Sequence, residues 1–224
     1  MMYVNGDSWT SGWPEEQIYG HQAFSWPYLL SELLDQPVLN DARAGCSNYR
    51  IYRRTFDYLL NQNPAVAIVS WTNWRRVEFG NAETGKIYQY LPTQSPQYFK
   101  KDWHPYLAYT TFLRQIIALQ IIAEKTNTKL WMIDTFSNNL IKNPTPEWFN
   151  NILREGQVFD LMDDDRVENK FKKVLALNSQ IDYNKFMFEI SYQQLVNNFQ
   201  LIDDHPVKDA HQHLAETIYK HLRK

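Results

Sequence analysis

Several features that mark particular classes of protein are missing from this chain of 224 residues. Cys46 is its only cysteine, so no disulfide can form within the chain, as is usual in a reducing compartment. Lys and Arg number 23 and Asp and Glu number 25, so the formal net charge is -2. Without a basic excess, no surface is marked for binding phosphates. We therefore expect no nucleic-acid partner.

The sequence as given also shows no targeting or membrane-spanning segment. It starts MMYVNGDS, without the basic and apolar regions of a secretory signal peptide. No apolar run approaches the roughly 18 residues that are needed to cross a bilayer. We expect a cytoplasmic protein without a membrane span.

Metal-binding patterns are missing as well. The HExxH motif is absent, and the acidic run at 163–165 lacks the ligand spacing of an EF-hand. His211 and His213 are two residues apart in an expected helix, so they do not share a face. We expect neither a metal nor another cofactor.

The sequence does contain an alternation of short apolar runs and longer amphipathic stretches. The apolar runs predict strands at 2–5, 37–40, 65–71 and 129–134, and the amphipathic stretches predict helices at 24–34, 47–61, 105–126 and 207–222. Residues 199–202 are either a short fifth strand or an extended lead-in to the last helix. This alternation predicts a three-layer α/β/α fold around a mainly parallel sheet of about five strands.

The length suits one domain over residues 1–224. Two longer stretches, 74–104 and 136–199, interrupt the alternation, and we expect them to wall a cleft. They contain many of the aromatic residues, which make up 15% of the chain. Aromatic and polar residues alternate there, as in a surface that contacts sugar rings.

Polar residues follow the predicted strands where a parallel sheet places its ligand site. Gly6-Asp7-Ser8 follows the first strand, Ala44-Gly45 the second and Thr72-Asn73 the third, and His205 precedes the last helix. A serine after a strand is more often a helix cap or a turn residue. A serine with an adjacent histidine base, however, is a competent nucleophile.

Taken in order, these blocks resemble those of the SGNH (GDSL-type) hydrolases over nearly the whole chain. The third block departs from the usual G-x-N-D, because it reads Trp71-Thr72-Asn73-Trp74, and Ala210 stands where the family usually has glycine. The resemblance implies a flavodoxin-like fold of the SGNH-hydrolase type and a serine esterase activity.

The resemblance also implies a catalytic triad. Ser8 would be the nucleophile, His205 its general base, and Asp203 the carboxylate that orients the imidazole. The family pairs the acid and the histidine as D-x-x-H or D-x-H. Ile202 occupies the first of these positions, which leaves Asp203 in the D-x-H register, with Asp204 as the alternative.

The oxyanion hole follows from the same resemblance. Its donors would be the backbone N–H groups of Ser8 and Gly45 and the side-chain amide of Asn73. Alone, Asn73 is more simply interpreted as a turn residue after a strand. Because the third block departs from the family pattern, Thr72 or Ser70 could point inward instead.

The implied substrate is a small-molecule or carbohydrate carboxylic ester, cleaved through an acyl-serine, and the alternating aromatic and polar residues favour an O-acetylated carbohydrate. Trp74 and Arg75 are the candidate substrate-binding residues, and Arg75 could meet an anionic group. Two alternatives remain open: a non-catalytic binding or assembly module on the same scaffold, and an O-acyltransferase.

Overall fold

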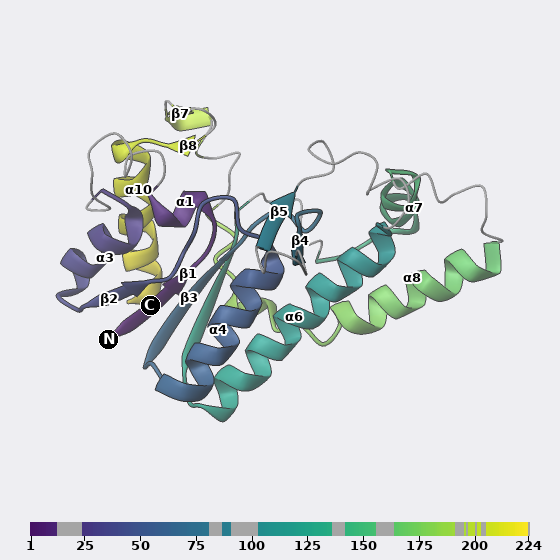
Figure 1. The fold of residues 1–224 in the computed structure, drawn as a ribbon, viewed down its shortest axis with the longest axis horizontal. Coiled ribbons are helices and arrows are strands. Elements are labelled where there is room, and N and C mark those ends of the chain that lie inside the picture. The colour runs from purple at the N-terminus through teal and green to yellow at the C-terminus, as the bar shows by residue number, and fades with distance from the viewer. Residues whose placement is uncertain are drawn as a thin grey trace.

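The computed structural model describes residues 1–12, 24–80, 87–90, 103–135, 142–155, 164–190, 195, 197–199, 201–202 and 205–223. Figure 1 shows a central sheet with helices on both faces, as the sequence predicts. The sheet contains β1 (Met2–Asn5), β2 (Val38–Asn40), β3 (Val66–Trp71) and β6 (Lys129–Asp134). The flanking helices are α3 (Trp26–Leu34), α4 (Asn48–Gln62), α6 (Pro105–Lys125) and α10 (Lys208–Leu222).

The four strands are parallel and run in the order β2-β1-β3-β6. Phe186 adds a single parallel bridge to Met132 of β6, at the position where a fifth strand would stand. Strand β7 (Leu201–Ile202) instead pairs antiparallel with β8 (His205–Pro206), away from this sheet. Residues 201–202 therefore form a short strand, as one of the two alternatives for residues 199–202 had it, but this strand is not a fifth strand of the main sheet.

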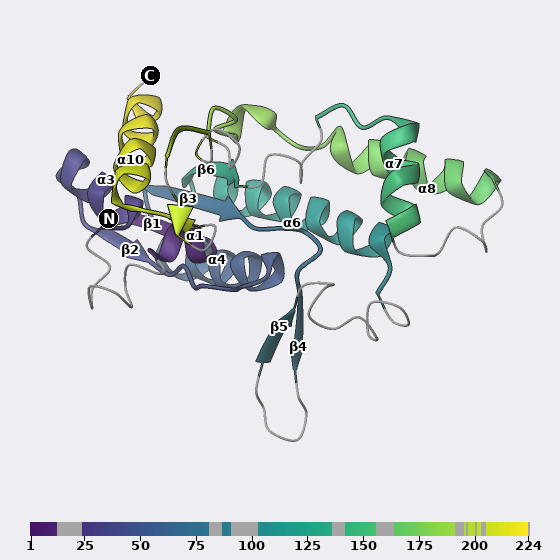
Figure 2. The same ribbon diagram turned by 90° about the horizontal axis from the view of Figure 1, so that it is seen from above.

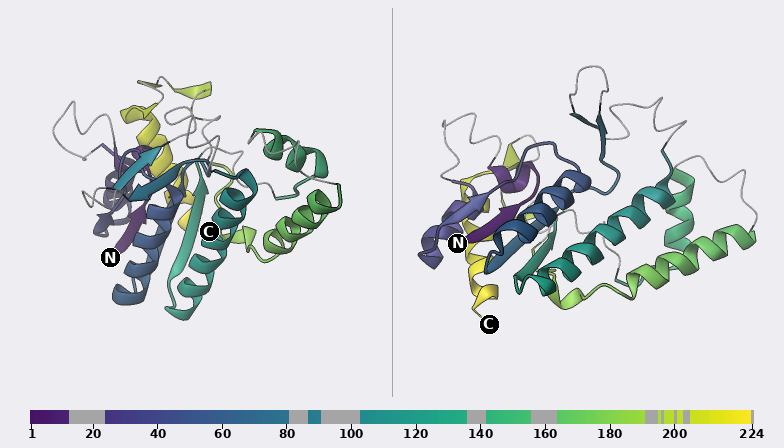
Figure 3. Two further views of the ribbon diagram at one scale, coloured as in Figure 1. Left: turned by 45° about the vertical axis from the view of Figure 1, so that its right-hand side comes forward. Right: turned by 60° about the horizontal axis from the view of Figure 1, so that its bottom comes forward.

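The alternation of side chains along each strand produces the two helical layers. On one face Tyr3 of β1 and Val69 of β3 pack into the cluster formed with α4 and α6. On the other face Val4 and Ile68 pack into the cluster formed with α3 and α10. Both faces of the sheet are covered, as Figure 3 shows, which explains why β3 is a continuous apolar run.

The ends of the helices are set by local chemistry. Ser47 caps α4, because its hydroxyl accepts a hydrogen bond from the backbone N–H of Arg50 at 3.2 Å. Asn63 ends α4 in the left-handed region, with φ 45°. Pro105 opens α6, where its missing N–H costs nothing.

Helix α6 has 21 residues and is apolar enough, by length and composition alone, to cross a membrane. However, 56% of its most apolar window is buried within the fold. The core helix of a globular domain meets the same criterion, so α6 is weak evidence for a membrane span.

The two predicted interruptions contain regular structure. The first includes an antiparallel hairpin of β4 (Val77–Gly80) and β5 (Ile87–Tyr90), which projects from the body in Figure 2. The second contains α7 (Pro146–Glu155) and α8 (Asp164–Asn178), which pack against α6. Their assignment as insertions that wall a cleft stays a prediction.

Candidate active site

The candidate site lies at the edge where the parallel strands end. The chain leaves β1 towards β2 on one side and later returns to β3 on the other, which creates the switch point where such sheets bind ligands. The short helix α1 (Ser8–Ser11) follows β1 at this edge, and β8 lies beside it. Figure 1 shows both above the sheet.

Ser8 and His205 meet at this edge although 197 positions separate them in the chain. Ser8 is the first residue of α1 and is 7% exposed, and His205 is half-buried on β8. The distance from Ser8 Oγ to His205 Nε2 is 2.8 Å. When Nε2 accepts the serine proton, the neutral imidazole carries its own proton on Nδ1. The pair therefore has the geometry of a nucleophile and its general base.

The carboxylate of the predicted triad lies outside the described residues. Asp203 and Asp204 both fall between β7 and β8, in the segment that the structure leaves undescribed. The role of Asp203, and the alternative of Asp204, stay predictions.

Gly6 makes room for the turn that presents Ser8. A Cβ atom at Gly6 would lie 2.9 Å from Cβ of Ser70 and closer still to the Thr10 side chain. Its φ is outside the left-handed region, so close packing requires glycine here rather than an unusual backbone conformation. Asn5 holds the turn from below, because its Oδ1 accepts from the N–H of Gly6 at 2.9 Å.

Gly45 needs glycine for the opposite reason. Its φ is 74°, and a Cβ atom there would meet no atom of the described residues within 4 Å. As far as the described residues go, the space beside Gly45 can admit a substrate. Its loop is bonded to the Ser8 turn, because Arg43 N and Cys46 Sγ both donate to the carbonyl of Gly6 at 3.1 Å.

The third loop is held against the same turn. Thr72 Oγ1 donates to Asp7 Oδ2 at 2.7 Å. Because Asp7 precedes Ser8 and Asn73 follows Thr72, this bond brings Asn73 close to Ser8. Asn73 Oδ1 accepts from Arg75 N at 2.9 Å, so the side chain does serve as a turn residue. That bond uses only the oxygen, and the amide Nδ2 keeps its donor capacity.

The other two candidate donors are engaged elsewhere. The Thr72 hydroxyl gives its proton to Asp7, and Ser70 Oγ is bonded to Thr135 Oγ1 at 2.5 Å. Asn48 holds the backbone of Thr72 through two hydrogen bonds of 2.9 Å. Asn48 Oδ1 accepts from Thr72 N, and Asn48 Nδ2 donates to the carbonyl of Thr72. Of Ser70, Thr72 and Asn73, Asn73 is therefore the residue whose side chain can still donate a hydrogen bond to an oxyanion.

Comparisons with protein-family models and with curated proteins gave no match. Solved structures do match. One is described as a lipolytic protein of the G-D-S-L family from Desulfitobacterium hafniense DCB-2, at 16% identity over 98% of both chains with a TM-score of 0.50. Another is TesA, at 14% identity over 99% of this chain and 97% of that one, with a TM-score of 0.53.

A third match is a mutant of Axe2, an acetyl-xylooligosaccharide esterase from Geobacillus Stearmophilus, at 14% identity over 98% of this chain and 92% of that one, with a TM-score of 0.53. The chain has the SGNH-hydrolase fold. The three-layer architecture that the alternation predicted, and the SGNH type that the resemblance implied, are therefore confirmed.

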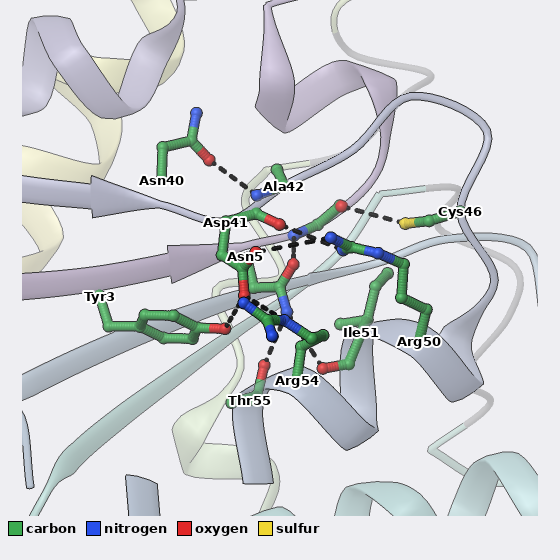
Figure 4. Close-up of polar contacts among 11 residues, drawn as sticks. Tyr3, Asn5, Asn40, Asp41, Ala42, Cys46, Arg50, Ile51, Arg54 and Thr55 are labelled. Atoms are coloured by element: carbon green, nitrogen blue, oxygen red, sulfur yellow. Dashed lines mark hydrogen bonds and ion pairs between the residues drawn. The ribbon is translucent and has the colours of Figure 1, made fainter. Parts of the chain in front are cut away.

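On this SGNH scaffold, Asp41 lies in the loop between β2 and α4 that contains Gly45, and Figure 4 shows its polar contacts. Its carboxylate accepts from Arg54 Nε at 2.9 Å and from the Tyr3 hydroxyl at 3.1 Å, while Arg50 Nη1 donates to its carbonyl at 3.1 Å. Burial and the charge of Asp41 raise the pKa of Tyr3, which keeps the phenol protonated as a donor. Sequence reasoning missed Asp41 because no motif includes it.

His211 is a second residue whose role the sequence did not indicate. It is fully buried on α10, and its Nδ1 accepts from the backbone N–H of Trp26 at 3.3 Å, at the first residue of α3. Burial, with a smaller effect of the nearby His205, lowers its pKa to about 3. His211 is therefore neutral at pH 7 and links the helix after His205 to the start of α3.

The two candidate substrate-binding residues form a stack. The Arg75 guanidinium lies 4.6 Å from the ring centroid of Trp74, and Trp74 stacks on Trp103 at 5.9 Å. The Trp74 side chain is only 4% exposed, so its ring packs against neighbouring residues and has no free face on which a substrate could stack. Among the described residues, no group of three His, Cys, Asp or Glu side chains is placed to hold a metal ion.

Proposed function

We propose that this chain is a serine esterase that hydrolyses a carboxylic ester through an acyl-serine intermediate. The observation that carries the proposal is the 2.8 Å contact between Ser8 Oγ and His205 Nε2 at the ligand-binding edge of an SGNH fold. The neighbouring loops support it, because Gly6 and Asp7, just before Ser8, accept hydrogen bonds from Cys46, next to Gly45, and from Thr72, next to Asn73.

In the proposed reaction, Ser8 Oγ attacks the acyl carbon while its proton passes to His205 Nε2. The negative charge that forms on the carbonyl oxygen meets the N–H groups of Ser8 and Gly45 and the Asn73 amide. As the intermediate collapses, Nε2–H gives the proton to the departing alcohol and the acyl group stays on Ser8. A water molecule then repeats the two steps and releases the acid.

Asp203 would complete the triad by accepting a hydrogen bond from His205 Nδ1–H. Its replacement by Asn should lower kcat by about 10³–10⁴-fold, because the wrong imidazole tautomer is then favoured. The same change at Asp204 should have little effect. The reverse result would assign the role to Asp204.

The central experiment compares wild type with Ser8→Ala and His205→Ala in p-nitrophenyl acetate hydrolysis and in labelling by a fluorophosphonate. We expect a clear wild-type rate, a loss of at least about 10³-fold in both variants, and a label on Ser8. Circular dichroism would establish that the variants are folded. An inert wild type with unlabelled Ser8 would contradict the proposal and favour a binding or assembly module.

We propose further that the ester is an O-acetylated carbohydrate. Free acetate released from an acetylated xylooligosaccharide would support this substrate, whereas hydrolysis restricted to long-chain acyl esters would contradict it. Adding unacetylated sugar acceptors tests the alternative of acyl transfer, because a transferase would then form a new ester instead of free acetate.

A further inference from the structure

A cavity of about 300 Å³ lies next to the candidate active site. It lies between the start of α4, the first turns of α6 and the segment that leads from β3 into β4. Leu107, Thr111 and Gln115 line it at intervals of four residues, so one face of α6 forms its wall. Its volume is at the lower end of the range of small-ligand sites.

The cavity is connected to both loops of the expected oxyanion hole. Asn48, one of its lining residues, clamps the backbone of Thr72, next to Asn73. Arg76, another lining residue, donates from Nη1 to the carbonyl of Cys46 at 3.2 Å, next to Gly45. A group in the cavity would therefore lie beside the place where the ester bond is expected.

The charges in the cavity wall are balanced. Glu78 has a side chain that is only 8% exposed, and it accepts from Arg53 Nη2 at 3.3 Å and from Ser47 Oγ at 3.2 Å. The cationic Arg76 lies in the same wall as this carboxylate. Among the described residues that line the cavity, Arg76 and Glu78 therefore offset each other, and this part of the wall suits a neutral ligand.

A buried amide in the wall has an unused polar atom. Gln115 is 7% exposed, and within the described part of the chain its Oε1 has no hydrogen-bond partner. Such an atom carries the full cost of its desolvation unless a ligand satisfies it. Because the terminal amide can turn about χ3, it can offer either its oxygen or its NH₂ to a ligand hydroxyl.

Other lining residues add a donor and an aromatic face. His104 Nδ1 accepts from Tyr106 N at 3.2 Å, which leaves the proton of the neutral ring on Nε2. Burial and the charge of Lys170 lower the pKa of His104 and favour this neutral form. Tyr49 at the rim is 51% exposed and presents an aromatic ring with a hydroxyl.

We propose that this cavity binds a neutral sugar through Gln115 and Tyr49, and that this sugar is the alcohol portion of the ester cleaved at Ser8. The role as alcohol subsite rests on the proposed esterase function. A sugar ring has hydroxyls for the amide and apolar C–H faces for the aromatic ring. An acyl chain would leave the Gln115 amide unsatisfied, and an anion would meet the Glu78 carboxylate.

The test uses two variants of the cavity and one control. Thr111→Trp fills the cavity from an exposed position of α6. Gln115→Leu replaces the amide with an apolar side chain of similar size. Ile121→Trp is the control, because Ile121 is exposed on the same helix and does not line the cavity. Gln115→Leu should fold with an unchanged or higher Tm, since it deletes a buried unpaired group.

Each protein is titrated with xylotriose and cellotriose by calorimetry, and its hydrolysis of ethyl acetate and of acetylated xylotriose is measured. We expect wild type and Ile121→Trp to bind sugar alike, Gln115→Leu to bind about 3–10-fold more weakly and Thr111→Trp to lose binding. Hydrolysis of ethyl acetate, whose alcohol is too small to need the cavity, should be unchanged, while KM for acetylated xylotriose should rise in both cavity variants.

The two proposals fail differently. Normal hydrolysis of ethyl acetate without sugar binding, or with equal binding by Thr111→Trp and wild type, would overturn the sugar site and leave the esterase standing. Sugar binding that depends on Gln115 in a protein that cleaves no ester would overturn the esterase, and with it the subsite role, while supporting the sugar site.

Discussion

At the residue scale, the candidate site depends on which atoms of each polar side chain bond to the protein and which are left to contact a substrate. Asn73 is the clearest case, because its oxygen closes a turn with Arg75 N while its NH₂ group is suited to an oxyanion. The turn role and the catalytic role were alternatives in the sequence. In the structure they are compatible, since they use different atoms of one amide.

Substitution of Asn73 separates the two roles. Asn73→Asp keeps the oxygen that accepts from Arg75 N but loses the donor, so kcat should fall by about 10²–10³-fold with an unchanged Tm. Asn73→Ala should lower kcat as much and Tm as well. Steady-state kinetics and thermal unfolding measure both effects. Full activity in Asn73→Asp would restrict this residue to the turn.

Sequence motifs could locate the candidate catalytic residues, but they could not locate the residues that hold the surrounding loops and helices in place. Ser8, Gly45 and Asn73 follow strands and match an ordered pattern, so sequence alone predicted their positions. Asp41 and His211 belong to no pattern. Their contacts join residues far apart in the chain, such as Tyr3 with Asp41 and Trp26 with His211, and only folding brings these pairs together.

At the element scale, α3 and α10 are joined by a hydrogen bond that depends on protonation. The Nδ1 atom of His211 can accept from Trp26 N only when the ring is neutral. The folded pKa is about 3, compared with an ordinary value of 6.5, so the folded protein binds this proton less tightly than the unfolded chain does. Stability should therefore rise with pH between about 3 and 6.5.

We expect His211 to lower the free energy of unfolding by about 2 kcal/mol between pH 7 and pH 5. Urea titrations at both pH values should show a smaller loss in His211→Gln, whatever the absolute stability of that variant. His213→Gln, at an exposed position of the same helix, should keep the wild-type dependence. Equal pH dependence in His211→Gln and wild type would contradict this interpretation.

The loop before α4 is the second element whose position matters. Asp41→Asn removes the charge that Arg54 and Arg50 contact, so we expect a loss of about 1–3 kcal/mol in the free energy of unfolding. Because Gly45 is in the same loop, kcat should also fall, by about tenfold, with KM less affected. Asp57→Asn, on the exposed side of α4, is the control. A normal kcat in Asp41→Asn would show that Gly45 is held without this anchor.

At the scale of the whole molecule, the site is made from both ends of the chain. Ser8 follows the first strand and His205 precedes the last helix, and the sheet with its two helical layers holds them 2.8 Å apart. Neither segment has catalytic geometry by itself. Activity should therefore require the fold as a unit.

Urea titration tests this expectation. Esterase activity and the fluorescence of buried residues such as Trp26 and Trp71 should be lost with one midpoint, because no part of the site survives without the sheet. Activity that disappears at a lower urea concentration than the fluorescence signal would show that the site opens before the core does.

The sequence by itself determined the alternation of strands and helices, the order of the polar blocks and the choice of Ser8 and His205 as candidate nucleophile and base. These properties depend on local apolar periodicity and on short motifs, which are readable without a fold. Only the tertiary structure decided that β7 and β8 stay outside the main sheet and that the Thr72 hydroxyl bonds to Asp7. It also decided that a cavity lined by one cationic and one anionic side chain adjoins the loops that contain Gly45 and Asn73. Those properties depend on which distant residues come into contact, and many different contacts satisfy the same local pattern.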